Sequence, residues 1–222
     1  MPQGKKKGAR PPPPGKEGSK GKQVAKGKSG SAGGGAPMHP PQPSKWPADC
    51  TYITDNIWSS DIPKEVVAKY KKDGRRQPPP GKPGGNKLVQ FMRITDPSHP
   101  ACGQNGLFAA KSIPGGGHVL DYVGLATLEA SESRESDYTL RLGEVTIDAD
   151  RYGNEARMVN DFRNTGQKQN ARFDTRADTN GDVRMAVWAG PRGIRRGDEI
   201  LVSYGKGYWA ARGLLPTAGD FW

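Results

Sequence analysis

Apolar residues are sparse in the first 45 positions and recur in short runs from Trp46 onward. From residue 87 these runs are separated by clusters of Gly, Pro, Asn and Asp, which favour turns. Short apolar segments at regular spacing are typical of a compact β-rich domain. The expected strands are 87–94, 106–113, 118–124, 137–149, 171–176, 183–190 and 199–205. The exception is residues 154–162, where Ala156, Val159 and Asn160 suggest one face of a short helix.

Residues 46–86 form a second pattern, with aromatic and aliphatic residues followed by a Pro/Gly-rich stretch. The segment 61–72, DIPKEVVAKYKK, predicts a short helix with Pro63 near its start. The segment 75–86, RRQPPPGKPGGN, is typical of a loop or linker. We therefore expect an ordered flanking segment that leads through this linker into the β-rich domain.

Charge separates the N-terminal 45 residues from the rest. They hold ten Lys or Arg and one acid, Glu17, within a chain of net charge +11. A segment so poor in apolar residues cannot offset the entropy of ordering, so residues 1–45 are expected to be disordered. The tail could contact nucleic-acid phosphates or an acidic protein surface, or it could only aid solubility. Its GKKKGAR stretch also resembles a nuclear import signal.

The composition excludes several classes of protein. Cys50 and Cys102 allow one disulfide at most and are too few for a disulfide framework or a four-cysteine zinc site. No apolar run approaches the roughly 18–20 residues that a membrane span needs, and the N-terminus lacks the apolar stretch of a secretory signal. We expect a soluble intracellular protein. Because the three histidines are widely separated, we expect no metal site.

Four motifs carry candidate chemistry. In order, they are CGQNGLFAAKSIPGG (102–116), VLDYVG (119–124), SDYTLRLGEVTIDADRYGNEARMVNDFRN (136–164, followed by QNARF) and GDEILVSYG (197–205). Alone, each has an ordinary explanation: a hairpin turn, a strand ending at glycine, a helix cap at Asn160, or a strand-end tyrosine at Tyr204. Their order along one chain is more informative than any single motif.

In this order the motifs resemble a SET domain, the fold of most protein lysine methyltransferases, over roughly residues 88–212. The resemblance implies a SET fold of small sheets with a C-terminal pseudoknot over residues 87–213, and a C-terminal tail at 214–222. Two departures stand out. The first glycine of the family's Gly-x-Gly loop is missing or displaced to Gly103. The family's His-Ser-Cys after Asn160 is replaced by residues 161–163, Asp-Phe-Arg.

The resemblance implies S-adenosylmethionine as cofactor and a lysine side chain as substrate. Tyr204 matches the family's tyrosine where cofactor and lysine meet, with Gly205 as the turn that keeps its hydroxyl from being packed away. Tyr138 is expected to act with it and, with Tyr208, to line the lysine tunnel, while Asp148 lies in a structural turn. Trp209 could cover the adenine or simply pack. The implied cofactor-binding residues are Gln104, Asn105, Gly106, Phe108, Tyr122, Arg157, Asn160 and Trp209.

Methyl transfer to lysine demands positioning and a neutral amine more than a strong acid or base. A narrow tunnel lined by aromatic side chains disfavours the charged ammonium form. The expected function is a protein-lysine methyltransferase acting on a histone or another basic nuclear protein, located in the nucleus or otherwise in the cytoplasm. One alternative is a catalytically silent SET-like module that binds chromatin; a weaker one is a basic nucleic-acid-binding β domain. The flanking segment 46–86 is expected to replace a zinc segment by packing.

Overall fold

The computed structural model describes residues 42–74, 85–128 and 136–211. The predicted basic tail and Pro/Gly linker lie mostly outside these residues, and the predicted C-terminal tail lies wholly outside them. The strands are β1 Thr51–Tyr52, β2 Ile57–Trp58, β3 Val89–Arg93, β4 Asn105–Ala109, β5 His118–Tyr122, β6 Leu125–Leu128, β7 Thr139–Leu142, β8 Val145–Asp148, β9 Tyr152–Gly153, β10 Asn160–Asp161, β11 Ala171–Ala177, β12 Val183–Ala189 and β13 Leu201–Val202. The helices are α1 Lys64–Tyr70, α2 Gly205–Ala211 and the 3₁₀ helix Glu155–Met158.

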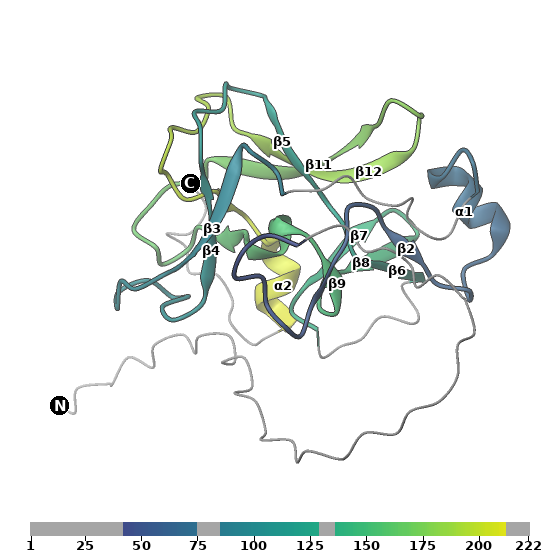
Figure 1. Ribbon diagram of the computed structural model, residues 1–222, viewed down its shortest axis with the longest axis horizontal. Coiled ribbons are helices and arrows are strands. Elements are labelled where there is room, and N and C mark those ends of the chain that lie inside the picture. The colour runs from purple at the N-terminus through teal and green to yellow at the C-terminus, as the bar shows by residue number, and fades with distance from the viewer. Residues whose placement is uncertain (1–41, 75–84, 129–135, 212–222) are drawn as a thin grey trace, which may run out of the picture.

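The strands form several small sheets in place of one large sheet (Figure 1). The two larger sheets have the orders β11-β12-β5 and β2-β6-β8-β7, and β3-β4, β1-β9 and β10-β13 pair two by two. In the first sheet Ala171 pairs with Ala189 and Met185 with Tyr122, all antiparallel. The structure confirms the expected β-rich class with small sheets and short helices.

Strand β12 is the central strand of its sheet and is buried along most of its length. Met185, Ala186, Val187 and Ala189 are all buried, as the nearly continuous apolar run VRMAVWA predicts for a strand covered on both faces. Burying a valine completely contributes about 1.5–3 kcal/mol. This strand therefore anchors β11 and β5 to the core.

Residues 198–202 run between two parts of the chain that are distant in sequence. On one side Ile200 N donates to Leu107 O of β4 at 2.7 Å. On the other side β10 pairs in parallel with β13, and Asn170 N donates to Leu201 O at 3.1 Å. The C-terminal strand is thus held between β4 and both ends of the segment 160–170. The threading that a pseudoknot requires stays a prediction.

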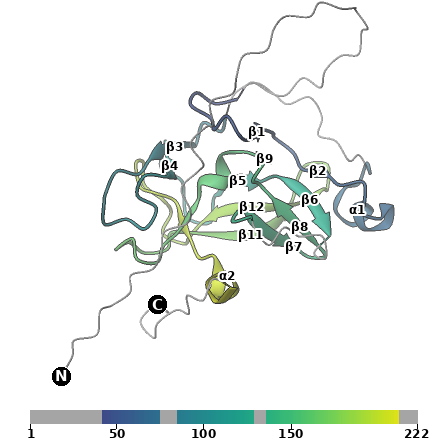
Figure 2. The ribbon, with the colours of Figure 1, turned by 90° about the horizontal axis from the view of Figure 1, so that it is seen from below.

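The N-terminal flank packs into the same core as the rest of the domain. Strands β1 and β2 add in parallel to β9 and β6, and Trp46, Tyr52 and Trp58 are buried. The α1 end carries a buried ion-pair cluster: Lys71 lies 3.1 Å from Asp55 and 2.7 Å from Asp182, and Arg184 pairs with Asp55 and with Asp178. In both views α1 lies at the end of the molecule opposite β3 and β4 (Figure 2). Whether this packing replaces a zinc-binding segment stays a prediction.

The helix expected over 154–162 is wrong in extent. Only Glu155–Met158 is helical, as a 3₁₀ turn capped by the Asn154 side chain, which accepts from Ala156 N at 3.2 Å. Val159 is extended and Asn160 belongs to β10, so Asn160 does not share a helical face. Pairing with β13 competes successfully with local helix formation here.

The helix near Pro63 is confirmed as α1, and both cysteines are unpaired, Cys50 buried and Cys102 exposed. Strand β6 and helix α2 were not expected from the sequence. Helix α2 begins directly at Gly205, whose φ of +84° favours glycine. No helix within 42–74, 85–128 and 136–211 is long and apolar enough to cross a membrane.

Candidate active site

The loop before β4 is shaped by the displaced glycine. Gly103 has a φ of +84°, in the left-handed region, whereas Asn105 has no positive φ and begins β4. Gln104 extends the turn by donating its backbone N–H to Ala101 O at 2.9 Å. The left-handed residue of this loop is therefore Gly103, two positions before Asn105.

Gly106 is required by packing against the C-terminal strand. A Cβ at this position would lie 2.7 Å from the Glu199 Oε1 atom and 3.0 Å from Ile94 Cδ1. The next residues keep this approach close, because Phe108 and Glu199 form an antiparallel bridge. The absence of a side chain at Gly106 thus leaves room for the Glu199 carboxylate.

Asn160 is held in place by a buried relay of polar side chains. Its Nδ2 donates to Glu199 Oε1 at 3.0 Å and lies 3.4 Å from Asn105 O. The other Glu199 oxygen lies 3.1 Å from His99 Nε2, and both side chains are buried. Because Ala101 N donates to His99 Nδ1 at 3.0 Å, the Nε2 atom carries the proton that reaches Glu199. The relay fixes Asn160 beside the loop that precedes β4.

Sequence reasoning missed both supports of Asn160. Glu199 follows a second acid in a surface-like stretch, and His99 stands between Ser98 and Pro100 with no pattern of its own. The two lie one hundred positions apart. The one available signal was Glu199 itself. It directly precedes the apolar run that leads to Tyr204, and an acid buried there needs a polar partner.

Tyr204 is more enclosed than its sequence suggested. Its hydroxyl donates to Val159 O at 2.7 Å, and its ring meets Tyr208 edge to face at 4.7 Å. Whether Gly205 keeps this hydroxyl accessible stays a prediction, because Tyr204 is partly buried. Burial raises the pKa of Tyr204 well above its ordinary value, and Tyr208 and Tyr122 add to the shift. The hydroxyl is neutral at physiological pH.

Asp161, which replaces the family's histidine, ties three elements together. Its Oδ2 accepts from Tyr204 N at 2.7 Å and from Trp209 Nε1 at 3.3 Å, so it fastens the start of α2. Its carboxylate also pairs with Arg163 Nη1 at 2.8 Å. The Asp161 carboxylate thus links β10 to Tyr204, Trp209 and Arg163. Trp209 is committed to Asp161 and to an edge contact with Tyr208 at 5.3 Å.

A third group of predicted residues lies around Tyr138. The Tyr122 hydroxyl donates to Tyr138 O at 2.7 Å, and burial raises the pKa of Tyr122 well above its ordinary value. The Arg157 guanidinium carbon lies 4.1 Å from the centre of the Tyr138 ring, and its Nε donates to Ala149 O at 2.8 Å. Asp148 accepts from Asp150 N at 2.9 Å, which fits the expected structural turn. Arg157 is therefore engaged by this turn and not by the Asn160 group.

One short segment connects these groups. Asn160 faces Asn105 and Glu199, the Val159 carbonyl receives the Tyr204 hydroxyl, and Asp161 holds the Tyr204 amide. Tyr122 belongs to the buried core cluster against which Tyr138 and Tyr204 both pack. Of the predicted residues, Asn105, Asn160, Tyr204 and Trp209 meet at Val159–Asp161, and their roles stay predictions.

Metal-ligand geometry is lacking in the part of the chain that the structure describes: no three His, Cys, Asp or Glu side chains there are placed to share an ion. Beyond the residues described, the structure gives no information. The expectation of a metal-free reaction stays a prediction.

Comparisons with known proteins agree with the motif order. Residues 104–205 match the family model of the SET domain. The curated proteins contain no match to the chain. Among solved structures, the Chaetomium thermophilum Polycomb Repressive Complex 2 in an autoinhibited conformation bound to S-adenosylmethionine has 23% identity and a TM-score of 0.43, covering 60% of this chain and 16% of that one.

Two further complexes give similar values. A humanized mutant of the Chaetomium thermophilum complex bound to the inhibitor GSK343 has 24% identity and a TM-score of 0.44, with 60% and 16% coverage. An active polycomb repressive complex 2 in the basal state has 27% identity and a TM-score of 0.43, with 54% and 15% coverage. The chain matches only about a sixth of the length of these structures. The match over residues 104–205 shows that the chain contains a SET domain.

Proposed function

We propose that this protein is a protein-lysine N-methyltransferase that uses S-adenosylmethionine. The observation that carries the proposal is the segment Val159–Asp161, which contacts the first residue of β4 on one side and Tyr204 on the other. A methyltransferase of this class needs its cofactor and lysine to meet at one point. The histone or other basic nuclear protein expected from the sequence remains the proposed substrate, with the nucleus as the proposed location.

The residues present fit the cofactor in their hydrogen-bonding chemistry. The Asn160 amide nitrogen is occupied by Glu199 and Asn105, while its Oδ1 has no partner among the described residues. That oxygen is an acceptor suited to an ammonium group, such as the one on the methionine part of the cofactor. Asn160 would hold the cofactor together with residues 104–106 and Phe108. When bound, S-adenosylmethionine supplies an electrophilic methyl group on a sulfonium.

Tyr204 would orient the lysine amine without acting as a base. Since burial raises the pKa of Tyr204 above its ordinary value of about 10, its hydroxyl keeps its proton at neutral pH. That proton is donated to Val159 O, so the lone pairs of the oxygen remain available to accept an N–H from the amine. A fixed acceptor of this kind aims the nitrogen lone pair, which is the main demand of the reaction.

The aromatic groups around Tyr204 would favour the neutral amine. Tyr138 and Tyr208 are proposed to line the lysine tunnel, where removal from water disfavours the ammonium form. Arg157 places a positive charge over the Tyr138 ring, and a nearby cation lowers the pKa of an ammonium group. The amine proton would leave to solvent before transfer, and no protein base is needed in this scheme.

Methyl transfer by the full-length chain tests the proposal. Purified protein is incubated with labelled cofactor and a panel of histones and cell extract. We expect label on lysine, and we expect Tyr204→Phe to reduce the rate about a hundredfold through misplacement of the amine. Tyr152→Phe, a half-buried tyrosine in β9, is the matched control and should retain the wild-type rate.

Two outcomes would contradict the proposal. The first is an absence of transfer to any lysine; the second is transfer by Tyr204→Phe at the wild-type rate. Cofactor binding then distinguishes the methyltransferase from the alternative predicted from the sequence, a catalytically silent module that binds chromatin. If the chain binds neither S-adenosylmethionine nor its demethylated product in calorimetry, it is a catalytically silent chromatin module.

A further inference from the structure

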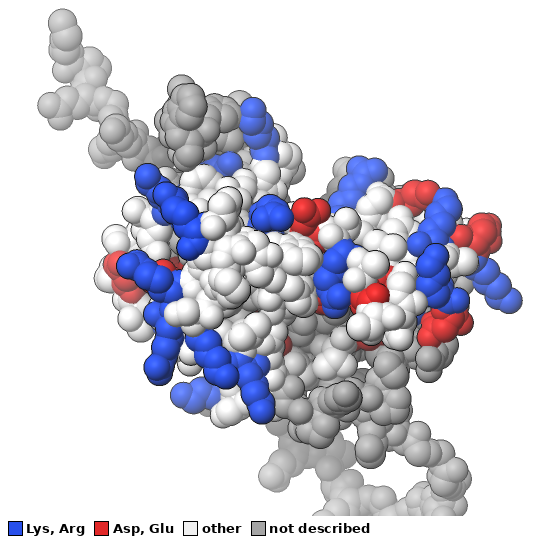
Figure 3. Space-filling view, turned by 90° about the horizontal axis from the view of Figure 1, so that it is seen from above, with Lys and Arg blue, Asp and Glu red and all other residues white. Residues whose placement is uncertain are grey.

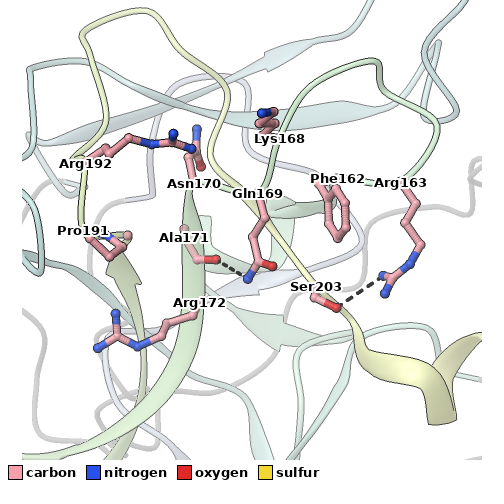
Figure 4. A pocket seen from close by; sticks show the side chains of 11 residues that line it. Phe162, Arg163, Lys168, Gln169, Asn170, Ala171, Arg172, Pro191, Arg192 and Ser203 are labelled. Carbon is pink, nitrogen blue, oxygen red and sulfur yellow. Dashed lines mark hydrogen bonds between the residues drawn. The ribbon is translucent and has the colours of Figure 1, made fainter. Parts of the chain in front are cut away.

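A second site lies beside the predicted active site. It is an open cavity of about 480 Å³, lined by residues 162–163, 168–172, 190–192 and Ser203 (Figure 4). None of the residues predicted to bind cofactor or lysine lines it. The two loops that form its walls are joined directly, since Gly190 N donates to Asn170 O at 2.7 Å.

The walls of this cavity are strongly and uniformly basic. Segments 162–172 and 190–197, here called the basic surface, contain six Lys or Arg residues and no acid. Four of them line the cavity, three from segment 162–172 and one from segment 190–197. The six are Arg163, Lys168, Arg172, Arg192, Arg195 and Arg196.

Most of this charge is not compensated. Arg163 is the exception, because Asp161 neutralises it in a buried pair. Arg172 lies 3.6 Å from Asp174 with about half of each side chain exposed, and Arg195 is 89% exposed beside Asp198. Exposed pairs of this kind attract only weakly. Lys168 and Arg192 form no ion pair with any residue that the structure describes.

The charge is also segregated across the molecule. In Figure 3, Lys and Arg gather with few acidic side chains at the left end of the face, whereas both signs are mixed at the right end. The view is turned about the horizontal axis, so its left end is the left end of Figure 1, where β3 and β4 lie. The domain is nearly neutral apart from its tail, but this end of it is not.

The surroundings favour a regular polyanion over an acidic protein. A stable protein interface usually buries an apolar centre. Among the described residues the only large hydrophobic side chain that is exposed is Met92 in β3, outside the basic surface. Cations spread over two loops match a row of phosphates, and guanidinium groups bind phosphate oxygens in pairs. Such contacts bind nucleic acid without reading its sequence.

We propose that the basic surface binds the phosphate backbone of double-stranded nucleic acid. Loops 162–172 and 190–197 supply the cations, and the cavity between them accepts a phosphate group. The buried Asp161–Arg163 pair fixes one wall. This contact is separate from any contact that the N-terminal tail makes, and it does not depend on methyl transfer.

Fluorescence anisotropy with a labelled DNA duplex tests the proposal on the full-length chain. The surface variant combines Lys168→Glu with Arg192→Glu. The matched control combines Lys64→Glu with Lys72→Glu, both exposed at the α1 end, so that net charge and tail are the same in both proteins. We expect the surface variant to lose at least about tenfold in affinity near physiological salt, and its slope of log affinity against log salt to fall by about 2.

Equal weakening in the two variants, or wild-type affinity in the surface variant, would overturn the proposal. Poly-glutamate serves as a second probe: if it binds as tightly as the duplex and is lost in the same variant, the partner is an acidic protein segment and the proposal fails. Melting temperatures check folding. Should the surface variant unfold, Lys168→Gln with Arg192→Gln is measured instead, with an expected fall in slope of about 2 and the same overturning outcomes.

Discussion

Two buried polar clusters at opposite ends of the domain use charge differently. At the α1 end, Lys71 and Arg184 are surrounded by three aspartates, and each charged group faces an opposite one. At the β4 end, Glu199 faces His99 on one side and the uncharged Asn160 on the other. In the first cluster every charged group is paired with another member of the cluster. The second cluster includes Asn160, a residue of the predicted site.

This difference separates stability from positioning. A closed ion-pair cluster has no group left over for a ligand, so its effect should be confined to holding the flank on β12. Removing one partner from it leaves an uncompensated buried charge, which is strongly destabilising. The Glu199 relay instead fixes the orientation of Asn160, so damage to it should change cofactor affinity more than it changes folding.

The largest expected effect is at the closed cluster. Lys71→Met should lower the free energy of unfolding by about 3–5 kcal/mol, because Asp55 and Asp182 would stay buried without their shared cation. Denaturant unfolding measures it. The matched control is Lys69→Met. It removes only an exposed ion pair with Glu144, so stability should be unchanged. Equal behaviour of the two variants would show that the cluster does not anchor the flank.

The second-largest effect is expected at Asp161, because this residue contributes both to stability and to the predicted site. Asp161→Ala would leave Arg163 largely buried without its carboxylate and would free Tyr204 N and Trp209 from their acceptor. We expect a loss of about 3 kcal/mol in the free energy of unfolding and faster hydrogen exchange at the start of α2. Unchanged exchange in α2 would mean that Asp161 does not hold this helix.

Damage to the Glu199 relay should change cofactor affinity more than it changes stability. His99→Leu removes the proton donor of Glu199 and the acceptor of Ala101 N, at a cost of about 1–3 kcal/mol in stability. Its distinguishing effect is on S-adenosylmethionine, whose affinity should fall about tenfold as Asn160 loses its fixed orientation. His118→Leu, which removes a partly exposed histidine paired with Asp121, is the control and should bind cofactor normally. Identical cofactor affinities in the two variants would show that the relay does not contribute to cofactor binding.

The smallest expected effect is a pH dependence outside both clusters. Burial alone would raise the pKa of Asp121, but hydrogen bonds from His118 and Arg176 outweigh it and lower the pKa below its usual range. A lowered folded pKa stabilises the fold above the unfolded value of about 3.9, and this stability is lost as pH falls through the folded value. Arg176→Met should flatten the acid limb of stability against pH; an identical limb would contradict this.

The sequence predicted the elements whose pattern is local. The alternation and apolar runs gave the main strands, and Pro63 marked the start of α1. Strand β10 and the shortened helix before it could not be predicted, because their pairing with Leu201 and Val202 comes from distant residues. Helix α2 was missed because Gly205 and Gly207 lower helix propensity, while Asp161 supplies the tertiary contact that holds it.

The candidate site was likewise predicted only in its local features. Motif order identified Asn160 and Tyr204 and brought them into one family pattern. It could not reveal that the Tyr204 hydroxyl is bonded to Val159 O, or that Arg157 turns toward Ala149. These are side-chain orientations set by tertiary packing. The His99–Glu199 contact joins residues one hundred positions apart and leaves no local trace.

The central claim is that Val159–Asp161 joins a cofactor site to Tyr204, and calorimetric titration of the full-length chain with S-adenosylmethionine tests it most directly. We predict saturable binding by the wild type and a loss of at least about tenfold in Asn160→Ala. The matched control Asn180→Ala, exposed in the turn between β11 and β12, should bind as the wild type does. No binding by the wild type, or equal affinities in the two variants, would contradict the account.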